Sequence, residues 1–428
     1  MLLKDATLVT LDPIFVGKGD LRIAGERIAE RAPALEPRDQ EDVWQLAGAL
    51  VLPGLVNAHT HLYSALARGM PAPAAPPRNF VEIHERVWWR LDRALDEESV
   101  YLSGLVGGIE AALSGTTLLF DHHASPGFIR GSLGTLRRAL EEVGVRSVLC
   151  YETTDRNGTQ GRDLGIEENV AFLDEANGLT RGMVGAHASF TLSEESLERL
   201  AAAARTKRSS VHIHVAEDRA DVEDCRKRFG SSPLDRLQRH GLVGPHALLA
   251  HCVHAGPADL EEAQQRGAWI AHNPRSNANN AVGYAPTGSF WQAALGTDGM
   301  DEDMLAEART AYLKMRDTGR SDAMGAALEM LAGGHRLASA VTGLPCGRLE
   351  TGAPADLVIF AYHPPTPLHE ENLGAHLLFG LDRSHVRSVL VAGRWVVRDR
   401  RVLGVDVPAA FARARRASES LWERMASL

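Results

Sequence analysis

Several histidines of this chain lie at the ends of apolar runs, where their spacing could create a metal site. His59 and His61 are two residues apart at the end of the run 51–61, so on a β-strand both imidazoles point to the same face. Two imidazoles on one face are half of a zinc site. His214 falls near the end of the run 210–217 and is the natural third ligand. Because a lone His-X-His pair is more often structural, the prediction depends on groups from other runs.

Carboxylates and one more histidine follow runs of the same kind. Glu217 comes three residues after His214, where a carboxylate can carry protons without binding the metal. His251 falls in the run 247–254 and is either a ligand or an electrophile beside the metal. Asp298 ends the run 294–299, where it can touch a metal ion and accept a proton from the water bound to it. Together these residues predict a hydrolytic metal centre.

The elements that must position these residues are short and regularly spaced. Helical patterns separate eight apolar runs, and polar residues gather at the C-terminal ends of nearly all of them. This alternation is typical of a (β/α)8 barrel, which builds its active site at that face. The eight runs are 51–61, 116–123, 146–153, 182–190, 210–217, 247–254, 268–274 and 294–299.

The two ends of the chain have a different residue pattern from the middle. The first fifty residues and the region after about 345 alternate apolar and polar residues around turns, including a hairpin at Ala392-Gly393. We therefore expect a metal-dependent hydrolase barrel over residues 54–345. A small β unit with a C-terminal helix should be formed from residues 1–53 plus 346–428.

Composition limits the classes of protein to which the chain can belong. Lys plus Arg is 46 and Asp plus Glu is 55, a formal charge of −9, which gives no indication of nucleic-acid binding. No apolar stretch is long enough to span a membrane, and the N-terminus lacks the layout of a signal peptide. The four cysteines are widely spaced, as in a cytoplasmic protein with reduced thiols.

Five motifs in fixed order carry a resemblance to a known family: HTH (59–61), HVAE (214–217), HCVH (251–254), HNPRSN (272–277) and GTDG (296–299). In these the chain resembles the cytosine deaminase and chlorohydrolase (ATZ/TRZ) branch of the amidohydrolase superfamily, and most closely the SsnA-type aminohydrolases. The resemblance covers nearly the whole chain. It implies a (β/α)8 TIM barrel with a small β-sandwich domain formed from both chain ends, and usually a homo-oligomer such as a dimer.

The resemblance also implies roles for individual residues. The metal ligands correspond to His59, His61, His214 and Asp298. The proton-shuttling pair corresponds to Glu217 and His251, and Asp298 would take the proton of the attacking water. A substrate-contacting histidine corresponds to His187. Two-metal relatives need a lysine at the end of the fourth strand, and the run 182–190 has none, so one divalent ion is expected. Zinc is the first expectation, although iron accepts the same donors.

Other substrate contacts rest on position alone. Arg68, seven residues after His61, could meet an anionic or carbonyl group or lie on the surface. Trp88 and Trp89 could stack on a flat ring, although their helical spacing with neighbouring apolar residues also fits a core position. Residues 62–98 are long enough for a lid over the site.

These observations predict a hydrolase that acts on carbon–nitrogen bonds in cyclic amidines. It would deaminate a small purine, pyrimidine or pterin-like heterocycle with water and release ammonia. A hydrolytic dechlorinase, or another C–N hydrolase, could use the same mononuclear site. A third alternative is a non-catalytic binding barrel, which the full set of ligands disfavours. The sequence does not identify the heterocycle.

Overall fold

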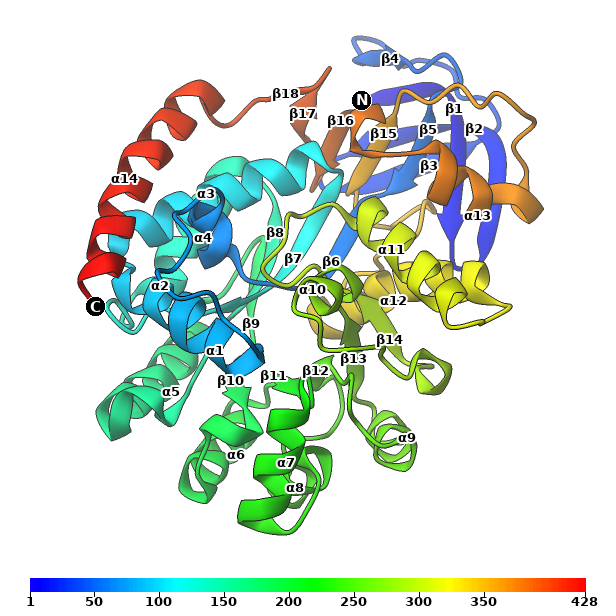
Figure 1. Cartoon of the computed structure of the whole chain (residues 1–428). Coiled ribbons are helices and arrows are strands. Elements are labelled where there is room, and N and C mark those ends of the chain that lie inside the picture. Colours follow the sequence, from blue (N-terminus) through cyan, green and yellow to red (C-terminus); the bar gives the residue numbers. More distant parts are fainter.

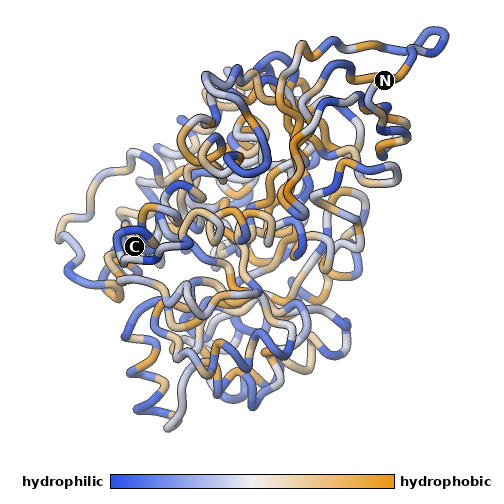
Figure 2. Tube along the Cα trace, turned by 90° about the vertical axis from the view of Figure 1, so that its right-hand side faces the viewer, coloured by the Kyte–Doolittle hydropathy of each residue, from blue (hydrophilic) through white to orange (hydrophobic).

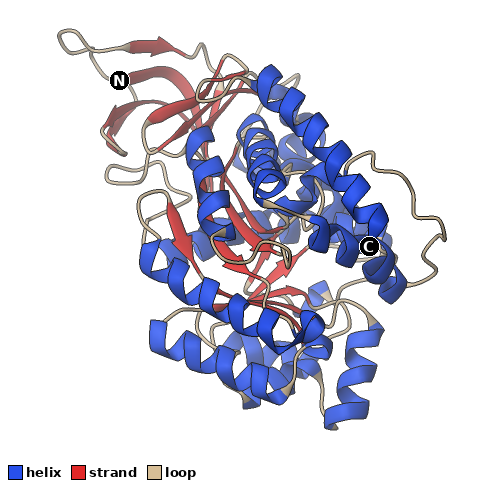
Figure 3. Cartoon of the chain, turned by 90° about the vertical axis from the view of Figure 1, so that its left-hand side faces the viewer, coloured by secondary structure: helices blue, strands red, loops and turns tan.

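The computed structural model describes residues 1–428 and contains two parallel β-sheets enclosed by helices (Figure 1, Figure 3). One sheet has the strand order β6-β7-β8-β9 and the other β10-β11-β12-β13-β14. A strand forms in each of the eight apolar runs, as predicted, and the fourth run (182–190) contains β10 together with the last residue of β9, so nine strands are labelled. The strands are β6 (Leu55–Thr60), β7 (Thr116–His123), β8 (Arg146–Tyr151), β9 (Thr180–Gly182), β10 (Val184–Ala188), β11 (Val211–Val215), β12 (Leu248–His251), β13 (Trp269–His272) and β14 (Ala293–Leu295).

These strands are buried on both faces, which explains their nearly continuous apolar sequences. Figure 2 shows the apolar segments concentrated in the interior and the polar ones along the outer loops. Isolated parallel bridges join the two sheets, one between Thr60 of β6 and Asp298 after β14, the other between Thr153, just after β8, and Ala186 of β10. The polar residues that end the strands are thereby collected at one place.

Helices follow the strands and cover their outer side (Figure 3). The segment between β6 and β7 is the longest and includes η1 (Leu62–Ala67) and the helical stretch of α1 (Phe80–Ile83), η2 (His84–Trp88) and α2 (Trp89–Ala94). The remaining helices of this part are α3 (Glu97–Leu113), α4 (Ser132–Val143), α5 (Gly158–Glu175), α6 (Glu194–Lys207), α7 (Arg219–Phe229), α8 (Pro233–Arg239), α9 (Pro257–Gln265), α10 (Pro274–Asn279), α11 (Met304–Asp317) and α12 (Ala323–Thr342). None of the helices is both long and apolar enough to cross a lipid bilayer.

Both chain ends contribute to one mixed sheet of nine strands, as the sequence texture indicates. Its order is β18-β17-β16-β15-β5-β1-β2-β3, and β4 pairs with β1. An apolar cluster that includes Leu8, Ile23, Val51 and Leu357 packs against this sheet. The strands are β1 (Leu2–Leu11), β2 (Ile14–Ala24), β3 (Arg27–Ala32), β4 (Val43–Gln45), β5 (Leu50–Pro53), β15 (Leu357–Phe360), β16 (Val386–Val391), β17 (Arg394–Arg398) and β18 (Arg401–Val402).

The C-terminal helix α14 (Val407–Ser427) is present, but it does not pack on the nine-stranded sheet. It lies along α3 and α2 (Figure 1). The indole Nε1 of Trp422 donates to the carbonyl of Leu66 (3.0 Å), and Nε of Arg424 donates to that of Ala94 (2.8 Å). The helix therefore secures the segment after β6. The short helix α13 (Leu373–Ala375) lies in the connection between β15 and β16.

Candidate metal centre and active site

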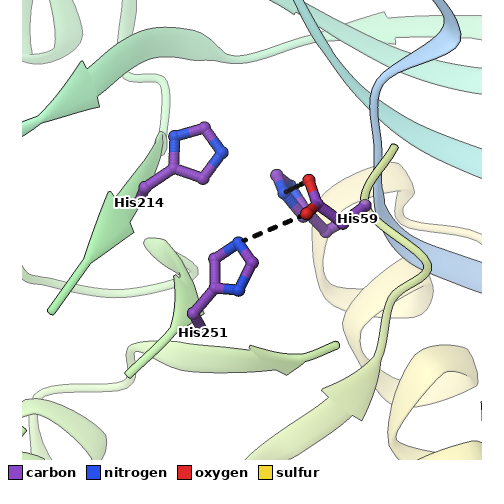
Figure 4. Close-up of side chains that lie close together, drawn as sticks. His59, His214 and His251 are labelled. Atoms are coloured by element: carbon purple, nitrogen blue, oxygen red, sulfur yellow. Dashed lines mark ion pairs between the residues drawn. The ribbon is translucent and has the colours of Figure 1, made fainter. Parts of the chain in front are cut away.

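The structure brings the four predicted ligands together at the ends of strands that are distant in sequence. His61 Nε2 lies 3.0 Å from Asp298 Oδ1 and 3.1 Å from His214 Nε2, and His59 Nε2 lies 3.4 Å from the same Asp298 oxygen. Figure 4 shows His59, His214 and His251 turned toward one another. Three imidazole nitrogens and one carboxylate oxygen at such separations can surround a single cation.

Backbone pairing at the strand ends explains why Asp298 reaches the histidines. The amides of Thr297 and Asp298 both donate to the carbonyl of His59 (2.8 and 2.9 Å), and the amide of His61 donates to that of Asp298 (3.3 Å). Asp298 has a positive φ of 55°, an uncommon conformation for a residue with a side chain. This turn directs its carboxylate inward.

The outer nitrogens of the ligand histidines are held by hydrogen bonds. Nδ1 of His61 donates to a main-chain carbonyl at the end of β7 (2.5 Å), and Nδ1 of His214 donates to one at the end of β10 (2.9 Å). Nδ1 of His59 shares a proton with Nε2 of His212 at 2.8 Å. Fixing Nδ1 in this way leaves each Nε2 lone pair facing the centre, as metal-binding histidines require.

Two buried nitrogen atoms and the charge of the surrounding groups indicate that a cation fits between these side chains. Nε2 of His59 and Nε2 of His251 are buried and have no hydrogen-bond partner, which is costly unless another group meets them. Although burial opposes protonation, the Asp298 carboxylate raises the pKa of His61 to about 9. Although burial opposes ionisation too, the imidazoles hold the pKa of Asp298 well below its ordinary value. A positive charge is therefore favoured here, and the donor set suits a divalent ion such as zinc.

A second set of possible ligands overlaps the first. His122 and Glu152 lie close enough to His61 and His214 to form a group of their own, with Nδ1 of His122 3.3 Å from Glu152 Oε2. A neutral imidazole nitrogen has one lone pair, so His61 and His214 cannot each bind two ions through Nε2. Their Nδ1 atoms are already engaged. Each of these two imidazoles can therefore serve only one ion at a time.

Acid–base groups stand on the side of the five-stranded sheet. Nε2 of His251 lies 3.6 Å from Glu217 Oε2 and 4.0 Å from Asp298 Oδ2. Burial raises the pKa of Glu217 to about 7, which suits a carboxyl that both gives and takes a proton near neutral pH. Nδ1 of His251 donates to the amide oxygen of Asn277 (2.8 Å), so its Nε2 faces the centre. Asn277 lies within a predicted motif but was not assigned this role from the sequence.

A cavity of about 940 Å³, measured out to its mouth, opens onto this cluster. His187 and Trp89, both predicted substrate contacts, lie on its wall, as does Trp88. The helical stretch of residues 80–94 supplies an aromatic side with Phe80 and His84. Among the wall residues that sequence reasoning missed is Asp92, because nothing in its helical surroundings distinguishes it from a solvated carboxylate.

Arg68 is not brought to this cavity. Its Nη2 donates to Glu110 Oε2 on α3 at 2.9 Å, and its side chain is 60% exposed. It lines a neighbouring pocket instead, together with His61 and Glu110. Of the two alternatives for Arg68, the geometry supports the surface position.

Comparison with known proteins gives a matching family model and a related sequence. The Amidohydrolase family model matches residues 50–396. A 5-methylthioadenosine/S-adenosylhomocysteine deaminase of Moorella thermoacetica is 32% identical over 429 residues, which cover 96% of this chain and 97% of that protein.

Two solved structures share the fold. An adenosine deaminase from Xanthomonas campestris with bound zinc has a TM-score of 0.83 at 22% identity, covering 100% of this chain and 98% of that one. The atrazine chlorohydrolase from Arthrobacter aurescens complexed with zinc also has a TM-score of 0.83, at 20% identity, covering 97% and 99%. At these identities the likeness concerns the fold alone.

Proposed function

We propose a function from one premise: the chain belongs to the amidohydrolase family. The protein is a metal-dependent aminohydrolase, which replaces an amino group on a small nitrogen heterocycle by oxygen and releases ammonia. The observation that carries the proposal is the convergence of three imidazoles and Asp298 beside a buried acid–base pair, Glu217 and His251. The relative from Moorella thermoacetica, named a deaminase, supports the leaving group.

The proposed architecture is the one that such a site needs. The two bridges between the parallel sheets support their closure into one (β/α)8 barrel over residues 54–345. The nine-stranded sheet and its own apolar cluster support a β-sandwich made from residues 1–53 plus 346–428. We exclude α14 from that unit in the proposal, since its contacts are with α2 and α3.

The proposed ligands are His59, His61, His214 and Asp298, with zinc as the ion. When bound, such an ion lowers the pKa of a coordinated water to about 7 and so supplies the nucleophile. Iron would fit the same donors.

The chain's own residues move the protons. Asp298 accepts the proton of the attacking water through the carboxylate oxygen that faces His251. Glu217 protonates the ring nitrogen next to the reacting carbon, which makes that carbon more electrophilic. Glu217 then takes the hydroxyl proton of the tetrahedral adduct and passes it to the amino group, which leaves as ammonia as the carbonyl forms, and the proton held by Asp298 restores that of Glu217. His251 steadies the attacking water by accepting a hydrogen bond at Nε2, and Asn277 holds it in that orientation.

Substrate contacts are proposed for His187 and Trp89. Nδ1 of His187 is bonded to Thr191 Oγ1 at 2.6 Å, which leaves Nε2 on the cavity side. The Trp89 ring is stacked under the guanidinium of Arg156 at 4.7 Å, so its orientation is fixed. Arg68 is omitted from the proposed site.

We propose further that the enzyme works in the cytoplasm as a homodimer on a small molecule. The free state of all four cysteines supports a reducing compartment. Dimerisation rests on the family alone, and light scattering would test it.

The test of the function is an ammonia-release screen with zinc-loaded protein and with Glu217→Gln as the control. Aminated purines, pyrimidines, pterins and adenosine-type nucleosides form the panel, together with a chlorinated triazine assayed for chloride. Ammonia release from at least one compound, abolished in the variant, is expected. Chloride release alone would replace deamination by dechlorination, and no turnover of any compound would refute the enzyme assignment.

A further inference from the structure

The wall of the active-site cavity has an uneven charge. It carries several carboxylates and no lysine or arginine. A cavity that receives an anionic substrate ordinarily presents a cationic side chain to it. The carboxylates are those of Asp92, Glu152, Glu217, Asp218, Asp221 and Asp298.

Four of these carboxylates already have work in the fold or the proposed chemistry. Glu217 and Asp298 belong to the metal centre. Asp221 accepts from the amides of Phe190 (3.0 Å) and Ala216 (2.8 Å), and Asp218 caps helix α7. Asp92 and Glu152 remain, and neither takes part in the proton transfers proposed for the reaction.

These two carboxylates share one guanidinium. Nη2 of Arg156 donates to Asp92 Oδ2 (2.9 Å) and to Glu152 Oε1 (3.2 Å). Arg156 is not itself on the cavity wall. Although burial opposes ionisation of Glu152, the histidines and the guanidinium around it hold its pKa below the ordinary value. Two carboxylates share this one guanidinium, so this side of the cavity offers more acceptor oxygens than guanidinium groups to meet them.

One buried acceptor atom on this wall also lacks a partner within the protein. Asp92 is 1% exposed, and its Oδ1 has no hydrogen-bond partner. Glu152 is 4% exposed and lies 3.7 Å from Nε2 of His187, the proposed substrate contact. Buried carboxylate oxygens are normally hydrogen-bonded, so donors from a ligand are expected to complete them. Glu152 follows β8 of the four-stranded sheet, whereas Glu217 and His251 belong to the five-stranded one.

We infer that the cavity selects an uncharged or cationic heterocycle, an inference that rests on the proposed deamination. The edge of this heterocycle that lies away from Glu217 carries N–H or O–H donors. Glu152 is the specificity-determining residue that accepts from that edge, and Asp92 offers a second acceptor. Compounds with a phosphate or carboxylate substituent are rejected, because no lysine or arginine on the wall compensates the repulsion from its carboxylates.

Matched substrates test this selectivity. With zinc-loaded protein, kcat/KM is measured for adenosine, for the cationic 5′-amino-5′-deoxyadenosine and for anionic adenosine 5′-monophosphate, and likewise for pterin and pterin-6-carboxylate. The uncharged and cationic members should exceed their anionic partners by about 100-fold or more. A kcat/KM for an anionic compound equal to that of its uncharged partner would overturn the inference.

The failure of this inference is distinguishable from the failure of the proposed function. If no compound is hydrolysed, deamination fails, but calorimetric dissociation constants for the same compounds still decide the charge selectivity. Equal affinity for neutral and anionic partners, or no binding of any compound, overturns the inference in that case.

The variant Glu152→Gln tests the assigned residue. Its ratio of kcat/KM for the cationic over the anionic nucleoside should fall by about tenfold or more at unchanged zinc content. The surface control Glu167→Gln should leave the ratio unchanged, since Glu167 is exposed and pairs with Arg130. Glu152→Asp keeps the carboxylate charge and should therefore retain the ratio of the wild type. If Glu152 had a purely structural role, its replacement would lower kcat/KM equally for all substrates. An unchanged cationic-to-anionic ratio in Glu152→Gln would therefore refute the assignment.

Discussion

Glu302 offers a quantitative test of how the metal ligands are supported. This carboxyl is buried behind the β6–β14 junction, where Asn57 Nδ2 donates to Oε2 (2.5 Å) and Thr60 Oγ1 donates to Oε1 (2.8 Å). Asn57 and Thr60 flank His59 in the sequence, so the network lies directly beneath the ligands. Burial raises the pKa of Glu302 from 4.5 to about 8.

The raised pKa of Glu302 determines how the stability of the folded protein depends on pH. Between pH 4.5 and about 8 the folded state retains a proton that the unfolded chain releases, so Glu302 reduces stability progressively as the pH rises through that window. At about 1.36 kcal/mol per pH unit, the full displacement corresponds to about 5 kcal/mol. An unfolding entropy of about 2.1 cal/mol/K per residue converts this to about 5 °C in Tm for a chain of this length.

The perturbation is Glu302→Gln, which removes the titration and keeps the shape. The Tm of both proteins is measured at pH 5 and pH 8.5 at one scan rate and one zinc concentration. We expect the variant to gain about 5 °C relative to the wild type between the two pH values, while the exposed control Glu167→Gln gains nothing. A constant difference between variant and wild type at both pH values would show that Glu302 is ionised in the folded state and refute the reasoning.

Three other substitutions have clear expected outcomes. Glu217→Gln should keep its metal and lose about 10²- to 10⁴-fold in kcat, and a rate near that of the wild type would show that Glu217 does not transfer the protons. Gly296→Ala would place a methyl group 2.8 Å from His59 Cβ and 2.9 Å from its amide nitrogen, so zinc affinity in a chelator competition should fall by about 10- to 100-fold. Gly134→Ala, in open space on α4, is the matched control. Arg68→Ala should change kcat/KM by less than about threefold, because its exposed ion pair with Glu110 contributes at most about 1 kcal/mol; a loss of 100-fold would return Arg68 to the site.

Sequence reasoning worked best where burial leaves a strong local pattern. Strands buried on both faces appear as short apolar runs, and each of the eight runs contains a strand. The hairpin at Ala392-Gly393 was equally readable, because both residues take the positive φ that such a turn needs. The convergence of His59, His61, His214 and Asp298 could be predicted because each lies near the end of a run, and the ends of parallel strands meet at one edge.

What could not be predicted depends on side-chain direction and on contacts between distant segments. Arg68 is near His61 in sequence, yet η1 turns it toward Glu110. The pairing of Asp92 with Arg156 joins residues 64 positions apart and leaves no local signal. The C-terminal helix α14 was predicted from its pattern, whereas its position along α3 depends on apolar contacts that only the fold creates.

The most direct test is an anomalous-scattering crystal structure of the zinc-loaded protein. It should show one zinc ion per chain, about 2.0–2.2 Å from Nε2 of His59, His61 and His214 and from an oxygen of Asp298. An ion held by His122 and Glu152 instead, a second ion beside the first, or no ion after zinc loading would contradict a mononuclear centre built from these four side chains.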